Sequence, residues 1–263
     1  MDAPDPVVLP ASFCGEDALT WLPSREGAPS EVCLEARGVT VIDAFGGAAL
    51  RAQAEYHARY RQKDVVIGPP SEPSAWAIVH AMLEYDPPAH LVPWGRGVVS
   101  PGPTPRSILI PALPVRDEAT ADAVAAGLVR QAGAEFRTQL RFLGGHLPEL
   151  IDNALRWGSS PIGAIVCAMH DRQRDELQLV VCDLGMSMVR DADAAQMLEE
   201  AITKAPEGSL RLLIEEAAAR DLSARVSLAT GPGRLRTSGT TWEQAGGSQV
   251  EGFAVSIVLP ARL

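Results

Sequence analysis

The sequence predicts an α/β protein made of two unequal lobes. Before residue 86, short apolar strand patterns alternate with helical patterns, which is typical of helices packed against a sheet. Eleven of the 21 prolines then fall between Pro69 and Pro114 and mark a boundary. After that boundary, two apolar runs joined by a short polar turn indicate a β-hairpin, so the second sheet should be mixed or antiparallel.

The composition excludes several classes of protein. The chain has 263 residues, a formal net charge of −10, 46% hydrophobic and 21% charged residues, which is typical of a globular protein and not of a disordered or fibrous one. The acidic balance argues against a nucleic-acid partner, which requires clustered Lys and Arg. No run approaches the roughly 20 apolar residues of a membrane span, and residues 1–12 lack the basic start of a secretion signal. We therefore expect a cytoplasmic protein with no nucleic-acid and no membrane partner.

The four cysteines do not form a metal-binding pattern. Cys14, Cys33, Cys167 and Cys182 contain no C-x-x-C pair and have no histidine cluster beside them, which argues against a zinc site. Cys167 and Cys182 each lie within an apolar strand pattern, where a thiol usually acts as a small buried hydrophobic group. This favours a reduced, cytoplasmic protein.

The first lobe is expected at residues 31–85. Residues 1–30 are rich in Pro, Ser and Gly, and we expect them to be loosely ordered. The spacing of apolar residues then predicts, in order, strands at 31–34 and 38–42, a helix at 46–61, a strand at 64–67 and a helix at 74–84.

The connection between the lobes, residues 86–116, should be loop with short extended pieces, because proline and glycine oppose a long helix or a central strand. The second lobe then covers residues 117–263. We expect Gly144-Gly145 to end its first helix and Pro148 to lie in the first turn of the next one. Its expected elements are helices 118–142 and 148–157, hairpin strands 163–170 and 176–182, helices 193–204 and 209–220, and closing strands 225–229 and 252–259.

The residues best able to carry chemistry lie on both sides of the expected hairpin. Glu149 and Asn153 are four residues apart and would share one face of a helix. A carboxylate beside a carboxamide can bind Mg²⁺ through oxygen, and the carboxylate can activate a water. Asp183 ends an apolar strand, where its carboxylate can accept a hydrogen bond from a ligand amine. Gly185 permits a sharp turn directly after it.

Two short segments of the sequence resemble motifs of a known family. Glu149-Leu-Ile-Asp-Asn153-Ala154 and Asp183-Leu-Gly185-Met-Ser187 resemble the N-box and the G1 box of the histidine-kinase-like ATPases, also called GHKL or Bergerat-fold proteins. The resemblance covers about residues 118–263. The family includes the anti-sigma factor kinases.

This resemblance implies a two-layer α/β sandwich with a mixed, largely antiparallel sheet, and a site for ATP or ADP with Mg²⁺. By analogy with the family, Asn153 would coordinate Mg²⁺ and Glu149 would act as the catalytic base. Asp183 would bind the adenine amino group, and Gly185 would shape the adenine pocket.

The chain also departs from the family pattern. Ser187 stands where the family has a second G1 glycine. Of the glycine-rich motif that contacts phosphate in the family, only Gly208 is matched. Phe253 follows Gly252 where the family usually has threonine. These departures weaken the half of the site that would hold the γ-phosphate. His146 lacks the context of a phosphoacceptor, which favours a packing role.

Residues 31–85 resemble, over a shorter stretch, the STAS domain of anti-sigma factor antagonists. The stretch Gly38-Val-Thr-Val-Ile-Asp43-Ala44-Phe45-Gly46 is similar to the strand-to-helix turn at which that family is phosphorylated on serine. Ala44 and Phe45 stand where the serine would be, so the lobe lacks that hydroxyl. An ordinary strand-to-helix turn is the alternative explanation of the pattern.

Together these resemblances lead us to expect a bacterial regulatory ATP-binding protein of the anti-sigma-factor-kinase type that acts by nucleotide-dependent partner switching. Nucleotide would order the lid, residues 186–208, and so change the surface shown to a protein partner such as a sigma factor or its antagonist. A weak ATPase or a Ser/Thr protein kinase activity and a homodimer are compatible with this hypothesis. The alternative is a degenerate pseudo-ATPase that serves as an interaction scaffold without nucleotide.

Overall fold

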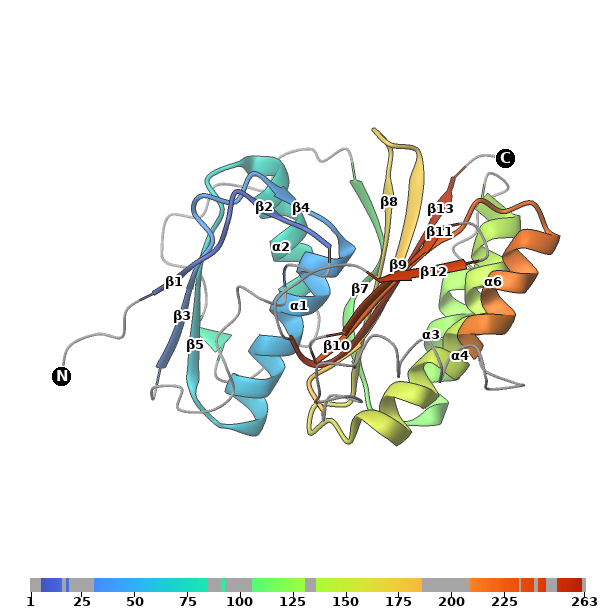
Figure 1. Ribbon diagram of the computed structural model, residues 1–263. Coiled ribbons are helices and arrows are strands. Elements are labelled where there is room, and N and C mark those ends of the chain that lie inside the picture. Colours follow the sequence, from blue (N-terminus) through green and yellow to red (C-terminus); the bar gives the residue numbers. More distant parts are fainter. Residues whose placement is uncertain are drawn as a thin grey trace.

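The computed structural model describes residues 6–15, 18, 31–84, 91–92, 106–130, 136–185, 209–231, 233–238, 241–244 and 250–261. The described elements stack in four layers: a small sheet, a pair of helices, a large sheet and a group of helices (Figure 1). Helices therefore cover the large sheet on both faces, and the expected α/β class is confirmed.

The small sheet and the two helices behind it form the first lobe. Its strands are parallel, in the order β1 (Val7–Val8), β3 (Glu31–Glu35), β5 (Asp64–Gly68) and β6 (Leu91–Val92). The helices are α1 (Ala44–Ala54), which continues as a π-helical turn over Glu55–Tyr60, and α2 (Pro73–Glu84). The expected strand at 38–42 is shorter, because only β4 (Val41–Ile42) pairs, with β2 (Ser12–Phe13). The alternation of strands and helices in residues 31–85 is otherwise as expected.

The N-terminal residues correct one expectation. We expected residues 1–30 to be loosely ordered, but residues 6–15 contribute β1 and β2 and pack into the core. Leu9 is 2% exposed and Phe13 is fully buried. The approach is close, because a Cβ added to Gly46 would lie 2.1 Å from the carbonyl oxygen of Phe13. A few apolar residues thus anchor this stretch despite its proline and serine content.

The large sheet belongs to the second lobe and is antiparallel at every pairing between its described strands. The expected hairpin is confirmed, since β8 and β9 pair from Ile165↔Cys182 to Asp171↔Glu176. The expected closing strands are also present, and β11 and β12 extend the sheet where we expected no strand. The order across the sheet is β12 (Thr241–Gln244), β11 (Gly233–Ser238), β10 (Arg225–Gly231), β13 (Val250–Pro260), β9 (Glu176–Asp183), β8 (Ala164–Asp171) and β7 (Arg106–Val115).

Strand β7 contradicts the expectation for the connection between the lobes. We expected loop with short extended pieces throughout 86–116, but residues 106–115 form a ten-residue strand that pairs with β8. It lies at the edge of the sheet, where proline is tolerated because one side of the strand needs no ladder hydrogen bonds. Its register shifts on both sides of Ile110, in the stretch that contains Pro111.

Helix α4 contradicts a second expectation. The helices of the second lobe are α3 (Glu118–Arg130), α4 (Arg137–Gly158) and α6 (Ser209–Ala219), and α4 runs unbroken through Gly144, Gly145 and Pro148. Gly144 lies against α3, where an added Cβ would be 2.5 Å from Cγ2 of Val129. At this position glycine permits close packing of two helices and does not end one. The helix expected at 193–204 lies outside the described residues.

The two neighbouring glycines of α4 should respond in opposite ways to alanine. Gly145 is exposed and has open space around its Cα, so Gly145→Ala should raise the free energy of unfolding by up to about 1 kcal/mol through helix propensity. Gly144→Ala should lower it by about 1–3 kcal/mol, because the new methyl meets the stiff side chain of Val129. Urea denaturation of both variants measures this, and equal effects would contradict the close approach of α3 and α4.

The large sheet has a core on each face. On β8, Ile165, Cys167 and Met169 pack with α1, while Val166 and Ala168 pack with the helices of the second lobe. Burial on both faces explains why β8 is an unbroken apolar run. Cys167 and Cys182 are fully buried, as expected, and burial raises the pKa of both thiols.

Polar contacts join the two lobes at both ends of α1. At its start, Nη1 of Arg106 donates to the carbonyl oxygen of Ile42 at 2.7 Å. At its end, Nη2 of Arg116 lies 2.9 Å from Oε2 of the buried Glu55. The interface between the lobes is therefore apolar along the helix and polar at its two ends.

Among the described residues, no helix combines the length and the apolar character that crossing a membrane requires.

Candidate functional site

Asp183 is the last residue of β9, and its side chain is fully buried. Leu179 and Val181 pack into the core beneath α4, and alternate residues of a strand share a face, so Asp183 points toward the helices of the second lobe. Its Oδ1 accepts a hydrogen bond from the backbone N–H of Gly185 at 2.6 Å. The turn that follows the strand therefore holds the carboxylate in place.

Two further contacts fix this turn. The backbone N–H of Leu184 donates to Oγ of Ser160 at 3.3 Å, which ties the turn to the segment after α4. On the neighbouring strand β13, Gly252 has φ +82°. A Cβ added to it would lie 2.2 Å from the carbonyl oxygen of Asp183. Only glycine permits both the backbone conformation and this approach.

The side of α4 that carries Glu149 and Asn153 faces α6. Glu149 and Asn153 lie three and seven residues after His146, so the three residues line one side of the helix. Nε2 of His146 lies 2.9 Å from Oε2 of Glu216 on α6, and its ring lies 4.9 Å from that of Phe142. These contacts agree with the packing role expected for His146.

The structure places the predicted site residues on elements that pack together. Asn153 is half-buried on α4, which packs against β9, the strand that ends in Asp183. Glu149 is exposed and lies in the middle of α4, which corrects our expectation that it lies near a helix start. The other two predicted residues, Ser187 and Gly208, and the expected lid at 186–208 lie outside the described residues.

Phe253 shares this part of the sheet with Asp183. The two residues are directly opposite each other on β13 and β9, so their side chains lie on the same face. Phe253 is 9% exposed and packs with the core of the second lobe. An aromatic ring therefore stands beside the buried carboxylate, on the face that looks toward α4 and α6.

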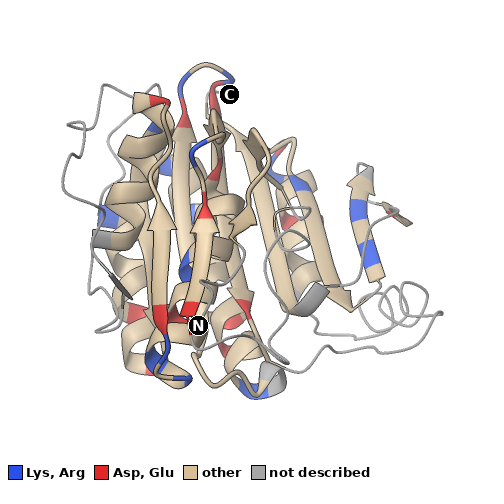
Figure 2. Ribbon diagram, turned by 90° about the vertical axis from the view of Figure 1, so that its left-hand side faces the viewer, with Lys and Arg blue, Asp and Glu red and all other residues tan. Residues whose placement is uncertain are grey.

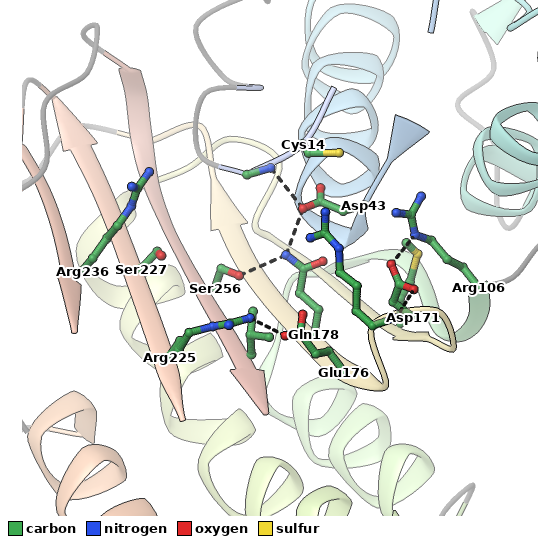
Figure 3. Close-up of a pocket in the computed structure, with 14 residues that line it drawn as sticks. Cys14, Asp43, Arg106, Asp171, Glu176, Gln178, Arg225, Ser227, Arg236 and Ser256 are labelled. Carbon is green, nitrogen blue, oxygen red and sulfur yellow. Dashed lines mark hydrogen bonds and ion pairs between the residues drawn. The ribbon is translucent and has the colours of Figure 1, made fainter. Parts of the chain in front are cut away.

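A cleft on the opposite face of the sheet was missed by the sequence analysis. It is a cleft of about 450 Å³ between the first lobe and the polar end of β9, β13, β10 and β11 (Figure 3). The residues that line it are Cys14, Gly15, Asp43, Arg106, Met169, Asp171, Arg174, Glu176, Gln178, Arg225, Ser227, Arg236, Ser256 and Val258. They come from six separate segments, and no local pattern of the sequence relates them.

Asp43 and Gln178 join the lobes at the floor of this cleft. Oδ1 of Asp43 caps α1 by accepting from the N–H of Gly46 at 2.9 Å. Nε2 of Gln178 donates to Oδ2 of Asp43 at 3.1 Å, and its Oε1 accepts from the N–H of Ala44 at 3.0 Å. Burial raises the pKa of Asp43, and the hydrogen bonds from Gly46 and Gln178 oppose that rise. The backbone N–H of Ala44, at the start of α1, therefore faces the second lobe.

Charged positions of both signs are scattered over the described strands and helices (Figure 2). No group of three or more His, Cys, Asp or Glu side chains within the described part of the chain is arranged to hold a metal ion. A magnesium ion at the Asn153 position would thus depend on the oxygens of a bound nucleotide.

Comparison with known proteins adds no relative: no family model, no curated protein and no solved structure matches this chain.

Proposed function

We propose that the chain is a bacterial regulatory nucleotide-binding protein of the anti-sigma-factor-kinase type, with ATP or ADP held between β9 and α4. The observation that carries this proposal is the fully buried carboxylate of Asp183, which ends β9 on the face toward α4. A buried acceptor at the edge of a core is suited to a ligand amine, because the surrounding protein excludes competing water. The antiparallel sheet covered by α3, α4 and α6 supports the Bergerat-type architecture that the N-box-like and G1-like segments imply.

Each residue has a distinct part in this proposal. Asp183 would accept from the adenine amino group, and Gly185 would let the ring approach the turn. Asn153 would hold Mg²⁺ together with nucleotide oxygens, and the ion would supply charge to balance the phosphates. Glu149, exposed on the same side of α4, would orient a water if the protein is a weak ATPase or a Ser/Thr kinase.

The first lobe gives the proposal its regulatory part. Its parallel strands and the capped start of α1 support a STAS-like domain that lacks the serine at Ala44. Nucleotide at the second lobe would change the surface shown to a protein partner, such as a sigma factor or its antagonist, in the cytoplasm. Homodimerisation would double that surface.

Isothermal titration calorimetry with ATP and ADP in the presence of Mg²⁺ tests the proposal. We expect micromolar binding that Asp183→Asn abolishes, because an amide keeps one accepting oxygen and replaces the other with an NH2 group that donates. Asn153→Ala should weaken binding only when Mg²⁺ is present. Asp64→Asn, an exposed residue of β5 in the small sheet, is the matched control and should bind as the native protein does. Absence of heat with both nucleotides would overturn the proposal.

One observation favours a second candidate, a pseudo-ATPase that acts as an interaction scaffold. Phe253 lies directly opposite Asp183 and packs on the face where adenine would enter. If its ring fills the pocket, nucleotide is excluded from the site. A rise of several degrees in the melting temperature with ADP and Mg²⁺ would contradict this candidate, since a ligand that binds the folded state must stabilise it.

A further inference from the structure

The cleft between the lobes has the features of a second binding site. It lies on the α1 side of the large sheet, whereas Asp183 points to the opposite side, so the sheet separates the two sites. Its volume, about 450 Å³, falls in the range of small-molecule pockets. Figure 3 shows its labelled side chains on strands of the sheet and at the start of α1.

The lining of this cleft has a small excess of positive charge, although the chain carries a net charge of −10. Four arginines line it, Arg106, Arg174, Arg225 and Arg236, against three carboxylates. Nε of Arg106 is paired with Oδ2 of Asp171 at 3.0 Å, and Nη2 of Arg225 is paired with Oε1 of Glu176 at 2.7 Å. The first pair holds the largely buried guanidinium of Arg106 in place, whereas the side chain of Arg225 is 63% exposed.

Further donors in the cleft are available to a ligand. The guanidinium of Arg174, on the β8–β9 turn, forms no hydrogen bond or ion pair with the residues that the structure describes. The hydroxyl of Ser227, on the floor, likewise has no partner within the described ranges. Beside it, Ser256 is only 4% exposed and accepts from Nε2 of Gln178 at 3.3 Å, which leaves the hydroxyl hydrogen of Ser256 free to donate.

We propose that this cleft binds a small phosphorylated molecule, whose phosphoryl group is held by Arg174 and Arg225 and by the hydroxyls of Ser227 and Ser256. Ser227 and Ser256 lie directly opposite each other on β10 and β13, and Arg174 comes from the hairpin turn, so the donors approach from different directions. A tetrahedral phosphoryl group accepts hydrogen bonds from several directions, whereas a planar carboxylate is satisfied by one guanidinium fork. Because the ligand would touch residues at the seam between the lobes, its binding should stabilise their docking.

Calorimetric titration of the full chain with sodium pyrophosphate, in magnesium-free buffer of low ionic strength, tests this site. We expect saturable binding that Arg174→Ala weakens by at least about tenfold, the loss typical of one charge-assisted contact. Arg172→Ala is the matched control, because Arg172 is an exposed arginine of the same turn that does not line the cleft. Ser227→Ala should weaken binding by a smaller factor.

Several outcomes would overturn the proposal. One is absence of heat with pyrophosphate, and another is an equal loss in Arg172→Ala and Arg174→Ala, which would indicate unspecific attraction. Succinate binding as tightly as pyrophosphate would contradict the phosphoryl assignment. Loss of pyrophosphate binding in Asn153→Ala would place the anion at the nucleotide site instead. Failure of the nucleotide proposal is distinguishable, since it leaves the effect of Arg174→Ala on pyrophosphate unchanged.

Discussion

Glu55→Gln should lower the free energy of unfolding by about 3–5 kcal/mol, the loss typical of removing one partner from a buried ion pair. Glu55 and Arg51 are both fully buried, with Nη2 of Arg51 2.6 Å from Oε1 of Glu55. Arg59 and Arg116 each place a guanidinium nitrogen 2.9 Å from the other carboxylate oxygen. Without the negative charge, the buried guanidinium of Arg51 loses the carboxylate of Glu55 in a medium that cannot solvate it.

Urea denaturation of Glu55→Gln and of a surface control measures this effect. Glu215→Gln is the control, because its partner Arg211 also lies four residues away and both side chains are about half exposed. Its loss should stay below about 1 kcal/mol. A similar loss in both variants would contradict the buried pair. The double variant Arg51→Met/Glu55→Leu should recover stability relative to Glu55→Gln, since it removes both buried charges.

Gly252→Ala should lower the free energy of unfolding by about 3 kcal/mol and weaken nucleotide binding. The left-handed backbone, φ +82°, costs an alanine about 1–2 kcal/mol. The new methyl would also lie 2.2 Å from the carbonyl oxygen of Asp183, so one of the two strands must shift, at a typical cost of about 1–3 kcal/mol. Any shift moves Asp183, the residue proposed to bind adenine, and we expect at least about tenfold weaker binding for a misplaced hydrogen bond.

Gly15→Ala separates backbone strain from the close contact. Gly15 also has a positive φ, +65°, but an added Cβ would meet no atom within 4 Å. Gly15→Ala should therefore lower the free energy of unfolding by the backbone strain alone, about 1–2 kcal/mol, and should leave nucleotide binding unchanged. Chemical denaturation and calorimetry on both variants give the comparison. Equal decreases in the free energy of unfolding would show that the close approach of Gly252 to Asp183 does not contribute to the effect.

Local patterns predicted most of the regular elements correctly. The hairpin of β8 and β9 follows from two apolar runs around a polar turn, and α6 follows from helical spacing. The errors fall where the surroundings outweigh local preference. Pro111 suits a long strand only because β7 lies at the edge of the sheet, and Gly144 stays within α4 because α3 packs against it. Phe13 orders a proline-rich segment because the first lobe buries it.

The candidate site was predictable only in part. Helical spacing placed Glu149 and Asn153 on one side of α4, and strand alternation put Asp183 on a definite face. That α4 packs on β9 follows from the tertiary fold alone. The cleft between the lobes had no sequence signal, because Arg106 and Arg225 are 119 residues apart and line the same cleft only through the order of strands in the sheet.

The sequence by itself determined the α/β class and the antiparallel hairpin, because hydrophobic periodicity and turn residues act over short distances along the chain. Tertiary structure alone decided that α1 lies between the two sheets and that the second sheet is buried on both faces. It also decided that Gln178 joins the lobes at Asp43. These features depend on which surfaces meet when the chain folds, and long-range contacts of that kind have no fixed spacing in the sequence.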